Sequence, residues 1–340
     1  MEWFDNHKSL FTTALLLFVV LTFMVAIRPA LNNEKINRPL PGAEPMNRDA
    51  LAGKKIFIAN GCVACHTQQV RNVEMDKMWG QRPSIAADYA ATSRTDVWRN
   101  TATLMGTERT GPDLTNVGNR QGSLEWNLTH LYNPRILVKE SVMPAYPWMF
   151  EIKESPAKND VIVNVPDAYL KNSAGKIVAT KEALQLVSYI QSLKQTKLPD
   201  GTVLPEFLYG KKQETGNITS GQEANKINGA ELYATHCQSC HQSNGEGLPG
   251  AFPALKGSKI VASDSLSVYI NIIMNGYSGR VSEGFGVMPA VGTNANLSPE
   301  EVTAIINHER KSWGNNATEV PAEEVKKIMD FINTQPQKTE

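Results

Sequence analysis

The chain has 340 residues, 41% hydrophobic and 20% charged, a composition that excludes wholesale disorder and allows two ordinary domains with connectors. Lys and Arg together number 34, as do Asp and Glu, so the charge gives no reason to expect a nucleic-acid partner. The four cysteines all lie within two short motifs, which leaves none for a separate disulfide framework.

A hydrophobic run lies near the N-terminus. Residues 10–27 contain no charge, proline or glycine, and this run approaches the roughly 20 helical residues that cross a bilayer core. A cleaved signal peptide is the alternative, but few basic residues precede the run and no convincing small-x-small cleavage site follows it. We therefore predict a transmembrane anchor over residues 1–30 and a proline-containing polar tether over residues 31–48.

A first folded unit is predicted over residues 49–195. The segment "NRDALAGKKIFIA" predicts a short helix, and residues 181–194 carry apolar side chains at helical spacing. Residues 161–180 contain two β-prone runs that could pair as a hairpin. The polar residues 196–226 lack periodicity and predict a linker.

A second unit over residues 227–335 repeats this order, from a short helix in "NGAELYATH" to terminal helices. Ser298 and Glu301 have the spacing of a capping box, and Pro299 suits the first helical position. We therefore predict a mainly α-helical fold, with an N-terminal transmembrane helix followed by two small helical domains in tandem.

The motif C-x-x-C-H occurs once in each unit, at Cys62, Cys65 and His66 and again at Cys237, Cys240 and His241. In c-type haem attachment the two thiols add to the porphyrin vinyl groups, and the histidine binds iron from one face. A zinc site made of four thiols, or two redox dithiols, would give no reason for a histidine to follow both cysteine pairs. The motifs therefore predict two covalently bound c-type haems and two class I cytochrome c domains.

A second axial ligand is expected on each iron, and methionine is the ligand that raises the reduction potential. Met143 in "SVMPAYPW" and Met288 in "FGVMPAVG" are the first choices, because each lies in a Met-Pro dipeptide within a Gly- or Pro-rich context. Met149 and Met274 rank second, and His130 is an alternative iron ligand to be tested.

The haem surroundings can also be predicted from the sequence. A backbone carbonyl usually accepts a hydrogen bond from the proximal imidazole, and the loops at Pro112 and Pro253 are the candidates. Haem propionates call for cationic partners, for which Arg71, Arg109 and Arg135 are candidates in the first unit.

Haem attachment also predicts the membrane topology. Covalent attachment takes place outside the cytoplasmic membrane, so we expect a single-pass protein of the bacterial inner membrane with its haem domains in the periplasm. The charges flanking the anchor favour the opposite orientation, because Lys8 precedes it while Arg28, Lys35 and Arg38 follow it. We give the attachment chemistry more weight than this small charge difference.

Four segments of the first unit carry a family resemblance: "LAGKKIFIANGCVACHTQQVR", "GTERTGPDLTNVG", "HLYNPR" and "SVMPAYPWM". In this order they closely resemble subunit II of the cbb3-type cytochrome c oxidases, a membrane-anchored monohaem cytochrome, from the anchor to about residue 150. The resemblance implies His66 and Met143 as axial ligands, and a catalytic haem–copper membrane subunit as partner. The second unit departs from the family, and residues 151–180 are poorly accounted for by its pattern.

The resemblance implies a dihaem electron-transfer subunit of a cbb3-type oxidase. A periplasmic donor, either a cytochrome or a cupredoxin, would reduce the second haem, then the first, then the catalytic subunit that reduces oxygen. The chain itself has too few histidines for a haem–copper centre. The alternatives are the cytochrome subunit of a nitric oxide reductase, a dihaem peroxidase and a free membrane-tethered shuttle. A peroxidase needs one haem iron with a labile sixth position. The Met-Pro candidate in each unit argues against that alternative.

Overall fold

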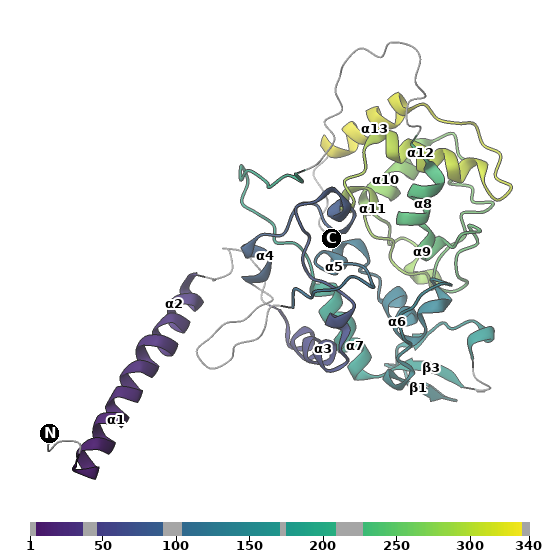
Figure 1. Ribbon diagram of the computed structural model, residues 1–340. Helices are drawn as coiled ribbons and strands as arrows, with labels where there is room; N and C mark the ends of the chain where they lie inside the picture. The colour runs from purple at the N-terminus through teal and green to yellow at the C-terminus, as the bar shows by residue number, and fades with distance from the viewer. Residues whose placement is uncertain (1–4, 37–45, 91–103, 171–174, 209–226, 335–340) are drawn as a thin grey trace.

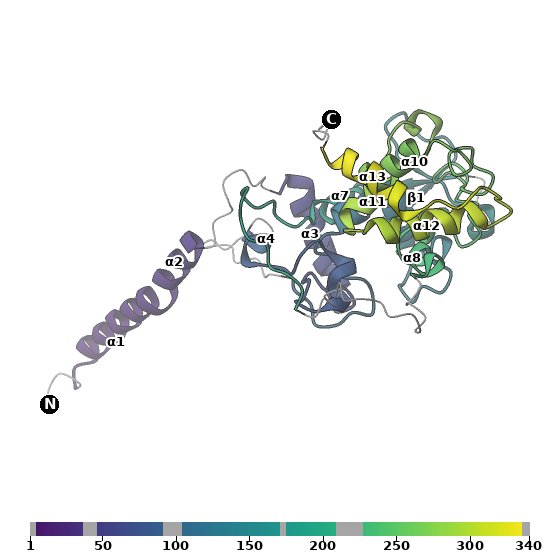
Figure 2. The ribbon, with the colours of Figure 1, turned by 90° about the horizontal axis from the view of Figure 1, so that it is seen from above.

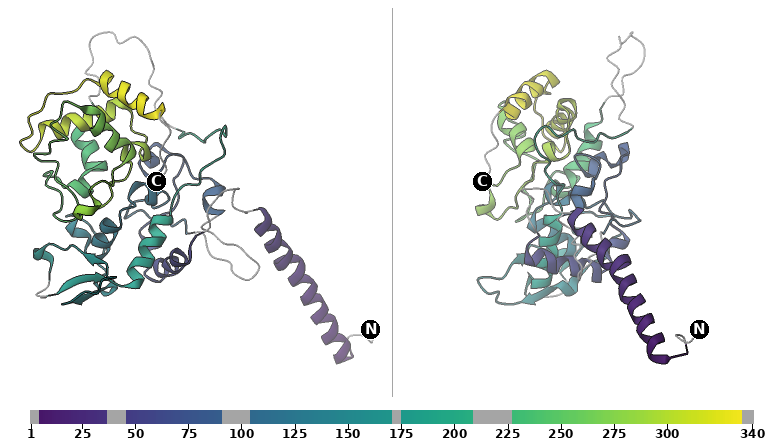
Figure 3. Two further views of the ribbon diagram at one scale, coloured as in Figure 1. Left: turned by 180° about the vertical axis from the view of Figure 1, so that it is seen from behind. Right: turned by 90° about the vertical axis from the view of Figure 1, so that its left-hand side faces the viewer.

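The computed structural model describes residues 5–36, 46–90, 104–170, 175–208 and 227–334 (Figure 1). Its N-terminal part is one helical rod formed by α1 (His7–Leu21), a π-helical turn (Thr22–Ile27) and α2 (Arg28–Ile36). The rod projects from the rest of the chain in the views of Figure 2 and of Figure 3, left.

The rod carries a helix long and apolar enough to cross a membrane, His7–Asn33, whose most apolar window has no buried residues. The predicted anchor is therefore helical, and α2 extends the helix to Ile36, into the first residues of the predicted tether. Residues 37–45 of the predicted tether lie outside the described residues.

The first domain contains helices and a small sheet. Its elements are α3 (Arg48–Ala59), 3₁₀ turns at Cys62–Ala64 and Glu74–Trp79, α4 (Ala86–Ala90), α5 (Val117–Arg120), α6 (Leu124–Tyr132), 3₁₀ turns at Pro134–Ile136 and Pro147–Met149, β1 (Phe150–Lys153), β2 (Ile162–Val163), a 3₁₀ turn at Asp167–Tyr169, β3 (Lys176–Ala179) and α7 (Lys181–Ser192). The predicted helices before the first motif and at the end of the domain are confirmed.

The sheet has the order β1-β3-β2 with antiparallel pairing throughout. The pairing of Ile162 with Val178 confirms the predicted hairpin. Strand β1 was not predicted, and it pairs Phe150 with Ala179 along the other edge of β3. Buried side chains of all three strands, including Phe150 and Ile177, join the first hydrophobic core.

The second domain is helical. Its elements are α8 (Gly229–His236), α9 (Gln238–His241), α10 (Leu266–Asn275), a 3₁₀ turn at Val281–Glu283, α11 (Val291–Asn294), α12 (Pro299–Lys311) and α13 (Ala322–Thr334). The predicted capping box is present, with Ser298 and Glu301 bonded reciprocally and Pro299 in the first turn of α12.

Helices α3 and α7 cross in close contact at Gly53. A Cβ atom at this position would lie 1.9 Å from the carbonyl oxygen of Gln185, so only glycine permits the approach. One turn further along each helix, the rings of Phe57 and Tyr189 meet edge to face with centroids 5.3 Å apart. The crossing fixes the helix that leads into the first motif against the last helix of the domain.

The second domain repeats this crossing between α8 and α12. A Cβ atom at Gly229 would lie 2.1 Å from the carbonyl oxygen of Ala304, and the rings of Tyr233 and His308 follow with centroids 5.3 Å apart. Both domains therefore position their C-x-x-C-H motif by the same kind of contact, between the helix that leads into the motif and a helix near the end of the domain.

The two domains pack against each other through a shared hydrophobic cluster. Ile136 and Leu137 of the first domain contact Leu248, Ala251 and Phe252 of the second, and all five are buried. The predicted linker starts on the first domain, where the backbone of Thr196 donates to Asp88 at 2.8 Å. Residues 209–226 of that linker lie outside the described residues.

Candidate haem sites

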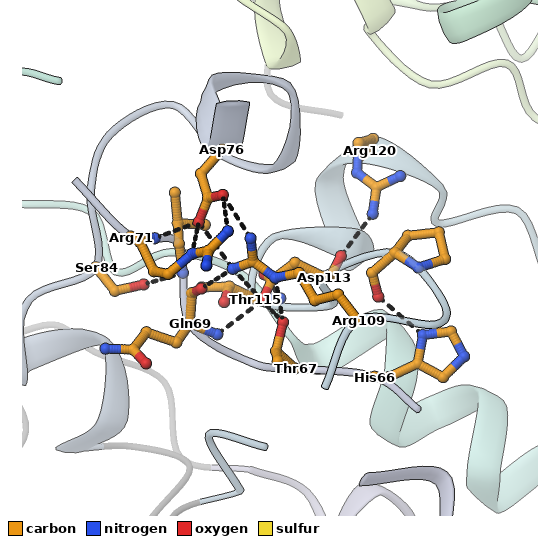
Figure 4. Close-up of polar contacts among 12 residues, drawn as sticks. His66, Thr67, Gln69, Arg71, Asp76, Ser84, Arg109, Asp113, Thr115 and Arg120 are labelled. Carbon is orange, nitrogen blue, oxygen red and sulfur yellow. Dashed lines mark hydrogen bonds and ion pairs between the residues drawn. The ribbon is translucent and has the colours of Figure 1, made fainter. Parts of the chain in front are cut away.

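The first motif begins where α3 ends. Gly61, with φ of 67°, turns the chain into the 3₁₀ turn that carries Cys62, and the amide of His66 donates to the carbonyl of Cys62 at 3.0 Å. This single turn places two thiols and the imidazole close together. Nδ1 of His66 lies 2.8 Å from the carbonyl oxygen of Pro112 (Figure 4).

This contact determines which nitrogen of His66 is free to bind a metal. A carbonyl oxygen only accepts, so Nδ1 carries the proton and Nε2 holds the lone pair. Burial lowers the pKa of His66, which keeps the ring neutral at pH 7. Gly111 lies flat against the ring, where a Cβ atom would come 2.3 Å from Cε1 of His66.

The second motif has the same arrangement. Nδ1 of His241 lies 3.0 Å from the carbonyl oxygen of Pro253, and burial lowers the pKa of this buried ring. Its Nε2 is therefore also the nitrogen with the lone pair. The two imidazole–carbonyl contacts are those expected from the sequence at Pro112 and Pro253.

A mainly apolar cavity adjoins the second motif. It is lined by Cys237, Cys240, His241 and Met288, together with Phe252, Ile272, Ile273, Val291 and Leu297. Two thiols, an imidazole and a thioether on one apolar cavity are the donors that a covalently attached haem uses, so the residues present fit this group. Within the described residues no three His, Cys, Asp or Glu side chains converge as metal ligands, so the four thiols do not meet in one site.

The candidate methionines lie in different surroundings. Met288 lines the cavity beside His241, whereas Met274 is buried in the core of its domain. Met143 is half-buried against the first core, and its carbonyl accepts from Nη1 of Arg135 at 3.2 Å. Met149 is 1% exposed within that core, the environment of a packing residue. Iron ligation by any of these methionines stays a prediction.

His130 stacks on Trp126, with ring centroids 4.5 Å apart and planes 13° from parallel. Its Nδ1 has no hydrogen-bond partner among the described residues. Burial and, to a smaller extent, the nearby charge of His66 lower the pKa of His130 to about 4. The ring therefore lies near the first site, and its role as an alternative ligand stays open.

Two of the three candidate propionate partners converge on Asp76 (Figure 4). Arg71 and Arg109 both donate to this carboxylate, which has no exposed surface, and Arg109 also donates to Oγ1 of Thr67 at 2.7 Å. Burial acts to raise the pKa of Asp76, but the bonds from Arg109 and Arg71 outweigh it and hold the pKa well below its usual range. Their contact with propionates stays a prediction.

We expect Asp76→Asn to lower the free energy of unfolding of the first domain by about 3 kcal/mol, because it removes the buried carboxylate that pairs with both Arg71 and Arg109 and leaves Arg109 only Asp113, at 3.6 Å, as a buried anion. The folded carboxyl has a depressed pKa, so its stabilisation is complete above about pH 5 and fades as pH falls below the unfolded value of about 4. Urea unfolding of the full chain at neutral and acidic pH measures both effects. Glu246→Gln is the control, because the ion pair of Glu246 with Lys256 is solvent-exposed. An equal loss of stability in this control variant would contradict the prediction.

Arg120 is a further candidate cation that sequence reasoning missed. Its Nη2 donates to the carbonyl of Asp113 at 2.8 Å, while its Nε has no partner among the described residues. The guanidinium lies 4.9 Å above the ring of Trp79, and burial lowers the pKa of Arg120 to about 10. Its positive charge lowers the pKa of His66, which places Arg120 beside the first site.

The first domain also contributes to the second site. Nε2 of Gln121 lies 3.5 Å from Sγ of Cys240, and Nε1 of Trp126 donates to the carbonyl of Ser239 at 3.1 Å. Gln121 also lines the cavity at the second motif. Local sequence spacing contains no signal for such contacts, because the partners lie in different domains.

Comparison with known proteins gives two family matches. The family described as "Cytochrome C oxidase, mono-heme subunit/FixO" matches residues 1–197, and the family "Cytochrome c" matches residues 227–313. The first match extends beyond residue 150, so the expectation that the family pattern leaves residues 151–180 unaccounted for was wrong.

Individual relatives are also cytochromes. A cytochrome c-552 of Thermus thermophilus is 36% identical over 121 residues, which is 33% of this chain and 80% of the relative. The cytochrome c subunit of the quinone alcohol dehydrogenase from Gluconacetobacter polyoxogenes is 28% identical over 149 residues, 43% of this chain and 30% of that subunit.

Proposed function

Because the chain belongs to the FixO family of mono-haem cytochrome c oxidase subunits, we propose that it is a dihaem electron relay of a cbb3-type haem–copper oxidase. The observation that carries the proposal is the repeated site geometry. Each unit presents two thiols and a neutral imidazole whose Nδ1 is held by a proline carbonyl. One chain thus combines a family-typical haem unit, a second cytochrome c unit and a candidate membrane span.

In this proposal each motif holds one covalent haem. Cys62 and Cys65 attach the first haem, and His66 with Met143 binds its iron. When bound, each haem supplies a one-electron couple, and the protein sets its potential through the axial ligands and the burial of the site. Pro112 holds the His66 ring in orientation and keeps its Nε2 basic.

The second haem is proposed to be attached to Cys237 and Cys240, with His241 and Met288 as its iron ligands. Pro253 orients the His241 ring as Pro112 orients its counterpart. With a haem bound, this mainly apolar cavity wall would limit its contact with water, which would favour the less charged, reduced state.

The proposed path runs from a periplasmic cytochrome or cupredoxin to the second haem, then to the first, and then to the catalytic membrane subunit. The helix His7–Asn33 anchors the chain in the bacterial inner membrane, with both haem domains in the periplasm. The proposed domain limits are residues 49–195 and 227–335, joined by a linker over 196–226. Oxygen reduction takes place on the partner, to which this chain passes electrons.

Mild solubilisation and purification through a C-terminal tag test this function. We expect b-type haem and copper to purify with the chain, and a reduced donor to support oxygen uptake by the preparation. Membranes that contain the untagged chain provide the control for non-specific capture. A chain that purifies alone with only c-type haem contradicts the fixed complex, and nitric oxide consumption without oxygen reduction assigns it to a nitric oxide reductase.

A further inference from the structure

The two haem motifs are joined by a packed contact between the domains. We propose that Trp126 and Gln121 of the first domain hold the haem attachment loop of the second domain in a fixed electron-transfer junction. This inference rests on the proposed relay and adds the residues through which electrons pass between its two haems.

The junction is built on the attachment loop itself. Trp126 donates its indole N–H to the carbonyl of Ser239, which stands between the two cysteines of the second motif. Gln121 directs its side-chain amide to the sulfur of Cys240, which would form one of the two thioether bonds. One of these contacts is made to the residue between the attachment cysteines and the other to one of the cysteines. The first domain therefore reaches the edge of the second site.

Apolar packing supports these polar contacts. Trp126 and Cys240 both pack against the shared cluster that includes Leu137 and Phe252, which is 5% exposed. Two further bonds cross the same boundary, from Asn164 to the carbonyl of Gly250 at 2.7 Å and from Asn294 to the carbonyl of Asn119. Several contacts spread over both domains favour one relative placement over free tumbling on a linker.

The other end of the junction lies at the first site. The ring of Trp126 stacks on His130, with ring centroids 4.5 Å apart, and His130 lies near enough to His66 for a charge on that ring to lower the pKa of His130. Packed groups therefore lead from Ser239 through Trp126 to His130. With a haem bound at each motif, each transfer would pass one electron from the second site to the first, and no bond would be made or broken.

The junction is tested on the purified full chain with both haems, without the oxidase. Hydroxyl-radical footprinting measures the oxidation rate of Phe252, and flash reduction measures how fast electrons redistribute between the haems. We expect Trp126→Ala to raise the oxidation rate of Phe252 roughly tenfold, because losing about 1.4 kcal/mol of packing makes the opened junction tenfold more populated. Electron redistribution between the haems should slow, because the ring that lies between Ser239 and His130 is removed.

Matched variants separate this role from general destabilisation. Trp126→Phe keeps a ring beside His130 but removes the indole N–H, and Gln121→Ala removes the contact to Cys240, so both should show smaller changes in the same direction. Trp148→Phe is the control, because this tryptophan of the same domain is 62% exposed and should change neither rate.

The proposal is overturned if Trp126→Ala leaves electron redistribution unchanged, whether or not Phe252 becomes accessible. Slowed redistribution without greater accessibility supports the route through the tryptophan. Both measurements use the isolated chain. Failure of the chain to purify with an oxidase would therefore contradict the proposed function but would not affect the test of the junction.

Discussion

A chain in which Cys237 and Cys240 are both replaced by alanine is expected to carry one covalent haem, where the unaltered chain carries two. The replacement removes the thiols of the second motif, while the first motif keeps both of its own. Haem content per chain, measured spectroscopically after denaturation, and the intact mass of the protein give the count directly. The reciprocal replacement of Cys62 and Cys65 should also leave one haem.

Ser239→Ala is the matched control for this experiment, because it changes the same attachment loop and keeps both thiols. The contact from Trp126 is made to the backbone carbonyl of Ser239, so this control also preserves the domain junction. A double-cysteine variant that still holds two covalent haems would show that the second motif is not an attachment site.

Gly111→Ala is expected to remove the native coordination of the first haem. The new Cβ would lie 2.3 Å from Cε1 of His66, so the ring must leave its position on the Pro112 carbonyl or the loop must move away. Overpacking of this kind also costs roughly 1–3 kcal/mol of unfolding free energy. Electron paramagnetic resonance of the oxidised full chain should show the low-spin signal of one haem altered and the other retained.

Gly61→Ala separates this steric effect from backbone strain. Gly61 has φ of +67° but nothing within 4 Å of an added Cβ, so alanine there costs about 1 kcal/mol in backbone strain and meets no ring. Spectra that change equally in the two variants would show that contact with the imidazole is not the cause.

Local spacing carried the predictions that the structure confirms. The capping box at Ser298 and Glu301 depends on residues three apart, and the helix before the first motif depends on apolar periodicity over one segment. The loops at Pro112 and Pro253 could be named because a proximal imidazole needs a carbonyl acceptor and few loops of suitable composition follow each motif.

Features that depend on distant partners could not be predicted in this way. Strand β1 follows directly after a 3₁₀ turn and is defined by its pairing with β3. Its own four residues carry no sequence signal for that pairing. The sequence pointed to Arg71 and Arg109 as cations of the first unit. It gave no sign that the fully buried Asp76 forms ion pairs with both. The contact of Trp126 with Ser239 spans 113 positions along the chain, a separation for which no sequence pattern gives a rule.

The crossing of α3 and α7 at Gly53 has a consequence for the order of events during synthesis. Gln185, which completes this contact, is synthesised long after the motif at residues 62–66, so the crossing cannot form until α7 has been made. We therefore expect the nascent chain to present both thiols in an open conformation until α7 has been synthesised, which leaves an interval in which the proposed haem could be attached. The second domain, closed by α12 in the same way, should pass through its own interval afterwards.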